Sequence, residues 1–309
     1  MALLALLPLA LLSVCPACRP HDSRKLIVVI VPSQDNPFFK SEADAAAVAA
    51  RNLGYAVRVD AHGDDAFRQD NLIDMAIASD ASALILDNAG SDASISAVKR
   101  AKAAGIACFL IDRDIKANGL AVAQIIADNN QGAILAGEEF ARQMGKTGNY
   151  AEILGKESDT NAQIRTHGFH SVLDRSPELV RAAAQSANWS QSEAFSKTET
   201  ILQAHPDLKG IIAGNDTMAL GAAAAVKANG RPTLIVGFDG SPDALAAIKG
   251  GQMKATVLQP AGLIARLAVS EVDEYLKKGS TGKPERQVVT CELVTARNVN
   301  EFGVFSRKE

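Results

Sequence analysis

Cysteine and histidine are scarce in this chain of 309 residues, which contains four cysteines and five histidines. Beyond residue 24 the sequence has no CxxC pair, no histidine-rich stretch and no zinc-like spacing. We therefore expect no metal site. Cys108 and Cys291 each lie in an apolar, strand-like context. We expect both to be buried thiols, because free cysteine packs as a small hydrophobe.

A glycine-rich phosphate-binding loop is also lacking. The first predicted strand ends in Pro32-Ser33-Gln34-Asp35-Asn36, where a dinucleotide-binding domain would carry its glycines. No paired nucleophile and base can be recognised in the chain. We therefore expect a protein that is not an enzyme and that binds no cofactor.

Charge of one sign is not in excess either. The net charge is −3 and charged residues make up 22% of the chain, so the composition does not indicate nucleic-acid or membrane-surface binding. Apolar residues make up 47%, which is ordinary for a soluble globular protein. The length suits two α/β domains better than one. Aromatic residues are only 5%, so each ring near a strand end carries information.

The first residues differ from the rest. Ala2 to Val14 carry no charge and are mostly leucine and alanine. We expect residues 1–24 to be an export leader, although the basic segment that usually precedes such an apolar run is missing. A lipoprotein leader is the alternative, with lipid attached at Cys18 or Cys15. The uncharged stretch ends at Arg19 and contains two prolines, which argues against a permanent membrane span.

From Lys25 onward, short apolar runs alternate with helical segments. The strands expected in the first half are Leu26–Val31, Ala56–Asp60, Leu84–Leu86, Ala107–Ile111 and Gln124–Ala127. The pattern then starts again, with strands expected at Tyr150–Leu154, Ile211–Ala213, Leu234–Phe238, Ala255–Gln259 and near Val288–Leu293. Ala-rich stretches with helical spacing separate them. This repetition predicts parallel sheets covered by helices, and the absence of a flexible linker predicts two lobes with a hinge.

Polar and aromatic residues follow several of these strands. Phe238 and Asp239 come after one strand, and Asp112 and Arg113 come after another. Ligands of open α/β sheets bind outside the carboxyl ends of the strands, so these residues are candidates for a site. Each group also has a plainer interpretation. Phe38 could belong to the core, Asp112-Arg113 could be a solvated turn, and Asn215 could be a helix cap.

Together the motifs resemble the ribose-type branch of the periplasmic sugar-binding proteins, the soluble receptors of bacterial ABC importers. The blocks that carry the resemblance are Asn36-Pro37-Phe38-Phe39, Asp112-Arg113, Gly214-Asn215-Asp216-Thr217-Met218-Ala219-Leu220-Gly221-Ala222 and Val236-Gly237-Phe238-Asp239-Gly240. The resemblance implies the type I periplasmic binding fold, in which two Rossmann-like α/β lobes with parallel sheets are joined by a three-stranded hinge. The implied lobes are 25–127 with 260–291, and 128–259 with 292–309.

Carried over by position, the resemblance implies ligand contacts from both lobes. Those expected from the first lobe are Asn36, Phe38, Phe39, Asp112 and Arg113, and those expected from the second are Arg165, Asn215, Phe238, Asp239 and, near the hinge, Gln259. Each arginine offers a planar fork of donors, and each aspartate accepts hydroxyl protons. The rings can cover the C–H faces of a sugar.

Two positions depart from the ribose binders. Asp87 stands where they carry an asparagine, and Trp189 stands where they carry a phenylalanine. A larger ring takes up pocket volume, and an extra carboxylate needs another donor. We therefore expect a small ligand rich in hydroxyls, either a pentose or a short polyol. The plainer interpretation makes Trp189 a core residue and places Asp87 in a surface turn.

The resemblance implies a monomer that closes on its ligand in the periplasm and delivers it to an ABC membrane permease. An input protein for a chemoreceptor or sensor kinase is a compatible alternative. A repressor core shares the two-lobe fold, but it would need an N-terminal helix-turn-helix where this chain has its apolar run.

Overall fold

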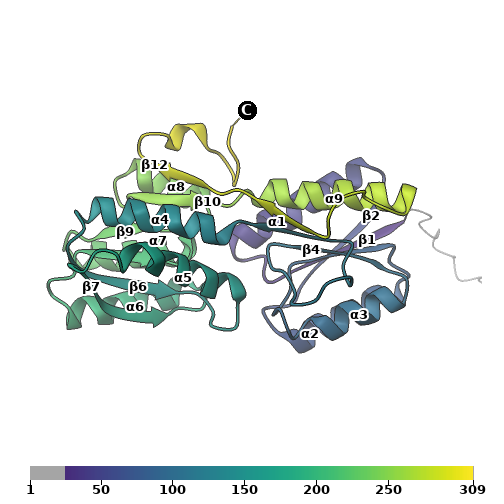
Figure 1. The fold of residues 1–309 in the computed structure, drawn as a ribbon, viewed down its shortest axis with the longest axis horizontal. Coiled ribbons are helices and arrows are strands. Elements are labelled where there is room, and N and C mark those ends of the chain that lie inside the picture. The colour runs from purple at the N-terminus through teal and green to yellow at the C-terminus, as the bar shows by residue number, and fades with distance from the viewer. Residues whose placement is uncertain (1–24, 309) are drawn as a thin grey trace, which may run out of the picture.

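The structure, a computed structural model, describes residues 25–308. The expected leader, with Cys15 and Cys18, lies outside these residues. The strands form two six-stranded sheets, and Figure 1 shows the two resulting lobes arranged end to end along the long axis. No helix in residues 25–308 is long and apolar enough to cross a membrane.

The first lobe contains the sheet β11-β5-β4-β3-β1-β2, in which all pairs are parallel. Helices α1 and α9 cover one face of this sheet, and α2 and α3 cover the other (Figure 1). The elements of this lobe are β1 (Leu26–Val31), α1 (Pro37–Asn52), β2 (Ala56–Ala61), α2 (Ala66–Ala78), β3 (Ala83–Leu86), α3 (Ile95–Ala103), β4 (Ala107–Ile111), β5 (Ala123–Ala127), α9 (Ala261–Lys278) and β11 (Arg286–Val289).

The second lobe contains the sheet β12-β10-β9-β8-β6-β7, in which only β12 runs antiparallel to its neighbour, β10. The elements of this lobe are α4 (Asn129–Gln143), β6 (Gly148–Leu154), α5 (Thr160–Leu173), β7 (Leu179–Ser186), α6 (Gln191–Ala204), β8 (Gly210–Ala213), α7 (Asp216–Asn229), β9 (Leu234–Val236), α8 (Pro242–Lys249), β10 (Ala255–Leu258), β12 (Glu292–Thr295) and the 3₁₀ helix η1 (Val299–Glu301).

The central strands are buried on both faces, as parallel strands between helices must be. In β1, Ile27 and Val29 join the core cluster beneath α1, while Val28 and Ile30 join the cluster beneath α2 and α3. All four side chains are fully buried. This explains why β1 is a continuous apolar run in the sequence. The expected α/β class with mostly parallel sheets is confirmed.

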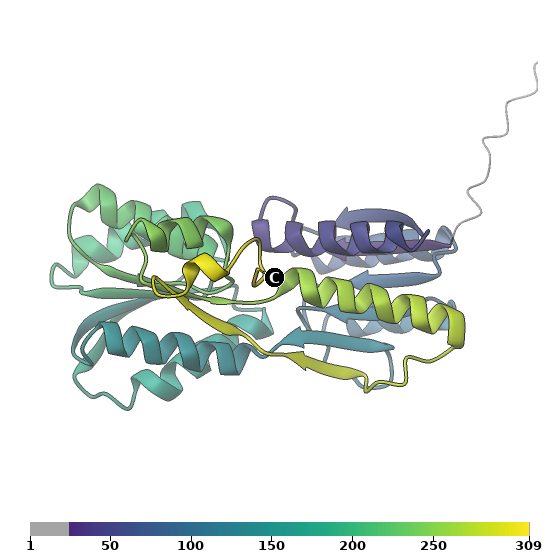
Figure 2. The ribbon, with the colours of Figure 1, turned by 90° about the horizontal axis from the view of Figure 1, so that it is seen from above.

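The described chain passes between the lobes three times: from β5 to α4, from β10 to α9, and from β11 to β12. Figure 2 shows these crossings close together, with the C-terminal segment beside them. We propose to divide the lobes at the crossings, in the places expected from the sequence. Cys291 lies in the third crossing, and both Cys291 and Cys108 are buried free thiols, as expected.

The sequence interpretation was wrong at one strand and missed further elements. The single strand expected near Val288–Leu293 is in fact two, β11 and β12, which lie in different lobes. Apolar residues on both sides of the crossing hide the break. Strand β7 and helix α6 were not predicted. Strand β7 lies at a sheet edge with most of its side chains at least partly exposed, so its sequence lacks the apolar alternation of a half-buried strand.

Candidate ligand-binding site

The carboxyl ends of the parallel strands in both lobes face one narrow cavity between the lobes. Ten of the twelve expected residues line it, together with Asp159 and Asn161. The ten are Asn36, Phe38, Phe39, Asp112, Arg113, Arg165, Trp189, Asn215, Asp239 and Gln259. Polar groups of both lobes therefore converge on one place, where a small polar ligand would contact both lobes at once.

The start of helix α1 brings two aromatic rings to the cavity. Asn36 caps the helix, and its Oδ1 accepts a hydrogen bond of 3.0 Å from the backbone N–H of Phe38. Pro37 fixes the first helical position. Phe38 and Phe39 then lie in the first turn with their rings edge to face, 5.6 Å apart between centroids. Both are part of the core cluster and also line the cavity, so the plainer and the functional interpretations both hold.

Arg113 follows β4 and is held by carboxylates from both lobes. Its Nη1 lies 2.9 Å from Oδ1 of Asp64, in the first lobe, and its Nη2 lies 2.8 Å from Oδ2 of Asp159, in the second. Nε is 3.5 Å from Oδ1 of Asp87. The guanidinium also lies over the ring of Phe39, 5.1 Å from its centroid. The pKa of Arg113, which burial alone would lower, is raised well above its usual value by Asp159, Asp87 and the neighbouring carboxylates.

Arg165 is the corresponding cation of the second lobe and projects from α5. Its Nε donates a bond of 2.8 Å to Oδ1 of Asn129, and Nη1 donates one of 2.7 Å to the carbonyl of Gly214. Nη1 also lies 3.4 Å from Oδ1 of Asp239. The guanidinium stacks on the ring of Phe238, 4.1 Å from its centroid. These contacts fix the plane of the guanidinium before any ligand arrives.

Asp239 and Gln259 come from adjacent strand ends of the second lobe. Gln259 Nε2 donates a bond of 2.9 Å to Oδ1 of Asp239. Asp239 has a φ of 131°, outside the region that side-chain-bearing residues favour. Asn215 caps α7, since its Oδ1 accepts from the N–H of Met218 at 2.9 Å. The cap interpretation of Asn215 is thus correct, and the residue nevertheless lies on the cavity wall.

Trp189 is seated in a slot between two glycines. A Cβ on Gly155 would come within 2.0 Å of the indole ring, and one on Gly214 would come within 3.2 Å. Trp189 also has a left-handed backbone, with a φ of 65°. Its Nε1 donates a bond of 3.1 Å to Oδ2 of Asp159. The ring is buried and lines the cavity, so it is not merely a core residue.

Two expected residues lie behind the cavity wall. Phe238 is fully buried beneath Arg165. Asp87 is also fully buried, behind Arg113, so the surface-turn interpretation of Asp87 is wrong. Neither residue lines the cavity, and both act on it through an arginine.

Asp159 and Asn161 were missed by the sequence interpretation. Asp159 caps α5 by accepting from the N–H of Asn161 at 2.9 Å, and it pairs with Arg113 across the cleft. Asn161 Nδ2 donates a bond of 3.2 Å to Oδ2 of Asp112, also across the cleft. A signal was present, because both residues follow strand β6 and shortly precede Arg165 along the chain. The rule that ligands lie at strand ends would have selected them.

Several acceptors in the site have no partner among the described residues. They include Oδ1 of Asp112 and Oε1 of Gln259. Burial raises the pKa of Asp112 to about 6, against the opposing effect of Arg113. Burial also raises the pKa of Asp239 well above its usual value, in spite of Arg165. Unpartnered buried acceptors are costly, so the site is suited to a ligand that brings hydroxyl donors.

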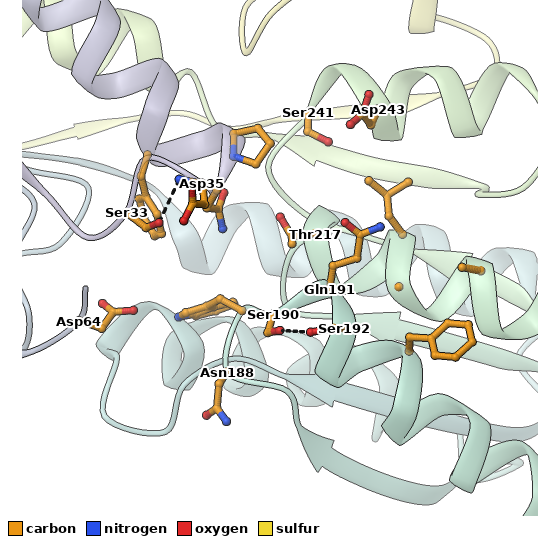
Figure 3. A pocket seen from close by; sticks show the side chains of 18 residues that line it. Ser33, Asp35, Asp64, Asn188, Ser190, Gln191, Ser192, Thr217, Ser241 and Asp243 are labelled. Atoms are coloured by element: carbon orange, nitrogen blue, oxygen red, sulfur yellow. Dashed lines mark hydrogen bonds between the residues drawn. The ribbon is translucent and has the colours of Figure 1, made fainter. Parts of the chain in front are cut away.

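An open groove leads outward from this cavity. Figure 3 shows Ser33 and Asp35 of the first lobe facing Gln191, Thr217 and Asp243 of the second. Three residues, Asn36, Phe39 and Trp189, line both the groove and the inner cavity. They therefore form the wall that separates the cavity from the groove. In residues 25–308 no group of three or more His, Cys, Asp or Glu side chains is placed to hold a metal ion.

The fold and the site together define a class of protein, the two-lobed binding proteins that enclose a small polar ligand between α/β domains. Comparison with known proteins leads to the same class. Residues 27–281 match the family of the periplasmic binding protein domain. The chain belongs to the periplasmic binding protein family.

Within this family, the chain is similar to several proteins whose ligands are named. The chain is 54% identical over 298 residues to a D-apiose import binding protein of Paraburkholderia graminis, an alignment that covers 96% of each chain. It is 31% identical to a ribose import binding protein of Bacillus subtilis, over 90% of this chain and 89% of the relative. A myo-inositol binding protein of Caulobacter, solved with myo-inositol bound, superimposes with a TM-score of 0.85 at 28% identity, covering 92% of this chain and 97% of that one. The ribose-type resemblance seen in the sequence is confirmed.

Proposed function

We propose that this protein is a periplasmic solute-binding protein that captures a small sugar between its lobes and delivers it to the permease of an ABC importer. The observation that carries the proposal is the cavity between the lobes, lined by donors, acceptors and aromatic rings from both of them. A sugar presents hydroxyls at its rim and C–H groups on its faces. Arginine, carboxylate and amide groups suit the rim, and aromatic rings suit the faces.

We propose D-apiose as the ligand. The relative that shares 54% of its residues with this chain is a D-apiose import binding protein, and the identity extends over 96% of both chains. Apiose is a compact, branched pentose that carries several hydroxyls. Unpartnered acceptors at the cavity, Oδ1 of Asp112 and Oε1 of Gln259, suit such a donor-rich ligand. Short polyols are the alternative ligands expected from the sequence.

Each group of side chains in the cavity has a proposed contact with the sugar that follows from its chemistry. Arg113 and Arg165 would donate to neighbouring hydroxyls, and Asp112 and Asp239 would accept from them. The rings of Phe38, Phe39 and Trp189 would lie against C–H faces of the sugar, while Asn36, Asn215 and Gln259 would complete the polar rim. Asp159 and Asn161 are added to the contacts expected from the sequence, because they line the same cavity.

The mechanism that follows is binding with domain closure and no bond-breaking chemistry. A ligand that touches both lobes interacts more strongly with the closed state than with the open one, so it shifts the population toward closure. The closed surface is then what the permease recognises.

We propose that the protein works as a monomer, which sedimentation analysis with and without sugar would test. Lipid attachment at Cys18 or Cys15 remains a proposal that mass spectrometry of the exported protein would test.

Titration calorimetry over a panel of sugars and polyols tests the ligand assignment. The panel contains D-apiose, D-ribose, a hexose, a disaccharide and four- and five-carbon polyols. We expect D-apiose to bind most tightly and D-ribose to bind at least about tenfold more weakly, since one lost hydrogen bond in a closed site costs about 1–2 kcal/mol. Tight binding of the hexose or the disaccharide alone would refute a site built for a pentose.

A further inference from the structure

Helix α1 places a glutamate in the protein interior behind the site. The side chain of Glu42 is fully buried, and neither Oε1 nor Oε2 has a hydrogen-bond partner among the described residues. Glu42 lies one turn after Phe38, whose ring lines the cavity. An ionised carboxylate left alone in such a place would cost several kcal/mol.

The group that faces Glu42 is another buried carboxyl, Asp87. Asp87 is also fully buried. Neither of its carboxyl oxygens has a hydrogen-bond partner among the described residues. Asp87 acts on Glu42 through its charge and as a side-chain hydrogen-bonding neighbour, and such a bond requires one of the two carboxyls to carry the hydrogen. The nearest cationic atom is Nε of Arg113, which is 3.5 Å from Oδ1 of Asp87 and is itself unpartnered.

We propose that Glu42 and Asp87 share a hydrogen, and that Glu42 thereby acts as a positioning residue for Arg113. A shared hydrogen satisfies one oxygen on each residue, since the carboxylic acid of one donates to the other. It also limits the pair to a single negative charge. Asp87 then presents that charge to the Nε edge of Arg113, and the guanidinium is held in the plane in which it lines the cavity.

The charged groups around the pair agree with this arrangement. The ends of β3 and β4 carry the charged groups that act most strongly on Glu42, namely Asp87, Asp112 and Arg113. Burial, followed by Asp87, raises the pKa of Glu42 well above its usual value. Burial raises the pKa of Asp87 likewise, with Arg113 opposing and carboxylates of both lobes adding to the rise.

The loop after β2 contributes two further titratable groups near Asp87 and Arg113. Asp64 pairs with Arg113 at 2.9 Å. His62 Nε2 lies 2.8 Å from the backbone carbonyl of Asp87, and burial lowers the pKa of His62 to about 4. His62 is therefore neutral at physiological pH and supplies no positive charge to the pair. From the second lobe, Asp159 adds a further negative charge at Arg113.

Unfolding measured without any sugar tests the shared hydrogen. A carboxyl whose folded pKa is raised stabilises the protein below its unfolded pKa of about 4.3, and this stability is lost as the pH rises toward the folded pKa. Glu42→Gln cannot ionise. Above pH 5 the wild type should therefore lose stability that Glu42→Gln keeps. The ratio of the unfolding equilibrium constant of Glu42→Gln to that of the wild type should fall by up to about tenfold per pH unit. Curves of denaturant unfolding against pH that run parallel for the two proteins would overturn the shared hydrogen.

Glu271→Gln is the matched control for this measurement. Glu271 is also fully buried, but its Oε1 lies 3.1 Å from Nζ of Lys283. Because the Glu271 carboxylate already has a basic partner, the substitution should not stabilise the protein. The same gain in both variants would show a general response to removing a buried charge, and it would overturn the specific pairing of Glu42 with Asp87.

Sugar affinity tests the positioning role, which rests on the proposed function. Glu42→Gln keeps a hydrogen for Asp87 and should bind D-apiose within about threefold of the wild type at pH 6. Glu42→Met has a similar volume but no hydrogen to share, and we expect it to bind at least about tenfold more weakly, the worth of one buried hydrogen bond. Wild-type affinity in both variants would overturn the positioning role. If no sugar of the panel binds the wild type, the proposed function fails, while the unfolding curves still decide the shared hydrogen.

Discussion

At the scale of single residues, the two arginines of the site are held in different ways. Arg113 is surrounded by carboxylates, at 2.8 Å from Asp159 and 2.9 Å from Asp64. Arg165 donates its shorter bonds to neutral oxygens, at 2.8 Å to Asn129 and 2.7 Å to a backbone carbonyl, and its carboxylate contact, with Asp239, is longer at 3.4 Å. Much of the charge of Arg113 is therefore compensated by the protein. Arg165 retains more of its capacity to bind an added acceptor.

The first prediction concerns Arg165. We expect Arg165→Ala to weaken sugar binding about a hundredfold, because removing one member of a buried, hydrogen-bonded set costs about 2–5 kcal/mol. The fold should persist, with a melting temperature lowered by a few degrees. Calorimetry and thermal unfolding measure the two effects. Arg175→Ala is the control, since Arg175 is exposed just beyond the same helix. Unchanged affinity in Arg165→Ala would remove this residue from the site.

The second prediction concerns pH and Asp112. Burial raises the pKa of Asp112 to about 6, so the folded protein binds a proton there that the unfolded chain releases near its usual pKa of about 3.9. Stability from this group is present below the unfolded pKa and is lost as the pH rises through about 6. Sugar binding should show the opposite trend, because the ionised oxygen accepts a hydroxyl proton. We expect affinity to fall up to about tenfold from pH 6 to pH 5.

Asp112→Asn is the variant that identifies the titrating group. It should bind more weakly than the wild type at pH 7 and show no change in affinity between pH 7 and pH 5. Titrations of the intrinsic fluorescence of Trp189, the single tryptophan of the chain, can follow both proteins. The same decline with acid in the variant would assign the pH dependence to another carboxyl, such as Asp239.

Much of the site could be predicted from the sequence because its residues follow strands. Asp112, Arg113, Phe238 and Asp239 stand directly after apolar runs, so the position of the run identifies them. Glu42 could not be found in this way. It lies inside an Ala-rich helix, and only the packing of α1 on the sheet shows that it points inward, toward Asp87.

At the scale of elements, the sequence pattern is reliable where a strand is buried on both faces. Strands β1 and β4 are fully apolar runs and were predicted with their bounds. Strand β7 is a mostly exposed edge, and its side chains follow no apolar alternation. The boundary between β11 and β12 depends on a crossing between lobes, which is a property of the tertiary structure. Local periodicity contains no information about it.

The third prediction concerns the loop that follows β6. A methyl group on Gly155 would come within 2.0 Å of the Trp189 ring, so Gly155→Ala should displace the indole from the cavity wall. We expect a shift in the tryptophan emission and at least about a tenfold loss of sugar affinity, with an intact fold. Gly303→Ala is the control, because a Cβ there meets nothing nearer than 3.8 Å. Unaltered emission and affinity in Gly155→Ala would show that the slot can widen without moving the ring.

At the scale of the whole molecule, the lobes are joined across the cleft by bonds that need no ligand. Arg113 of the first lobe pairs with Asp159 of the second, and Asn161 donates to Asp112. Nζ of Lys156 donates a bond of 3.0 Å to the carbonyl of Asp64. These contacts favour the closed state by themselves. The sugar therefore has to supply only the remaining difference in free energy between the open and closed states.

The fourth prediction is that weakening these bonds opens the unliganded protein. Asp159→Asn keeps the helix cap and an acceptor for Trp189 but loses the charge that pairs with Arg113 at 2.8 Å. We expect a larger radius of gyration without sugar, an unchanged one with saturating sugar, and affinity weakened about tenfold, since the ligand must then supply more of the free energy of closure. Small-angle scattering and calorimetry measure these quantities. Asp92→Asn is the control, because its ion pair with Lys116 is exposed and lies within the first lobe. A radius and an affinity that both match the wild type would mean that the ion pair forms only as a consequence of closure and does not contribute to it.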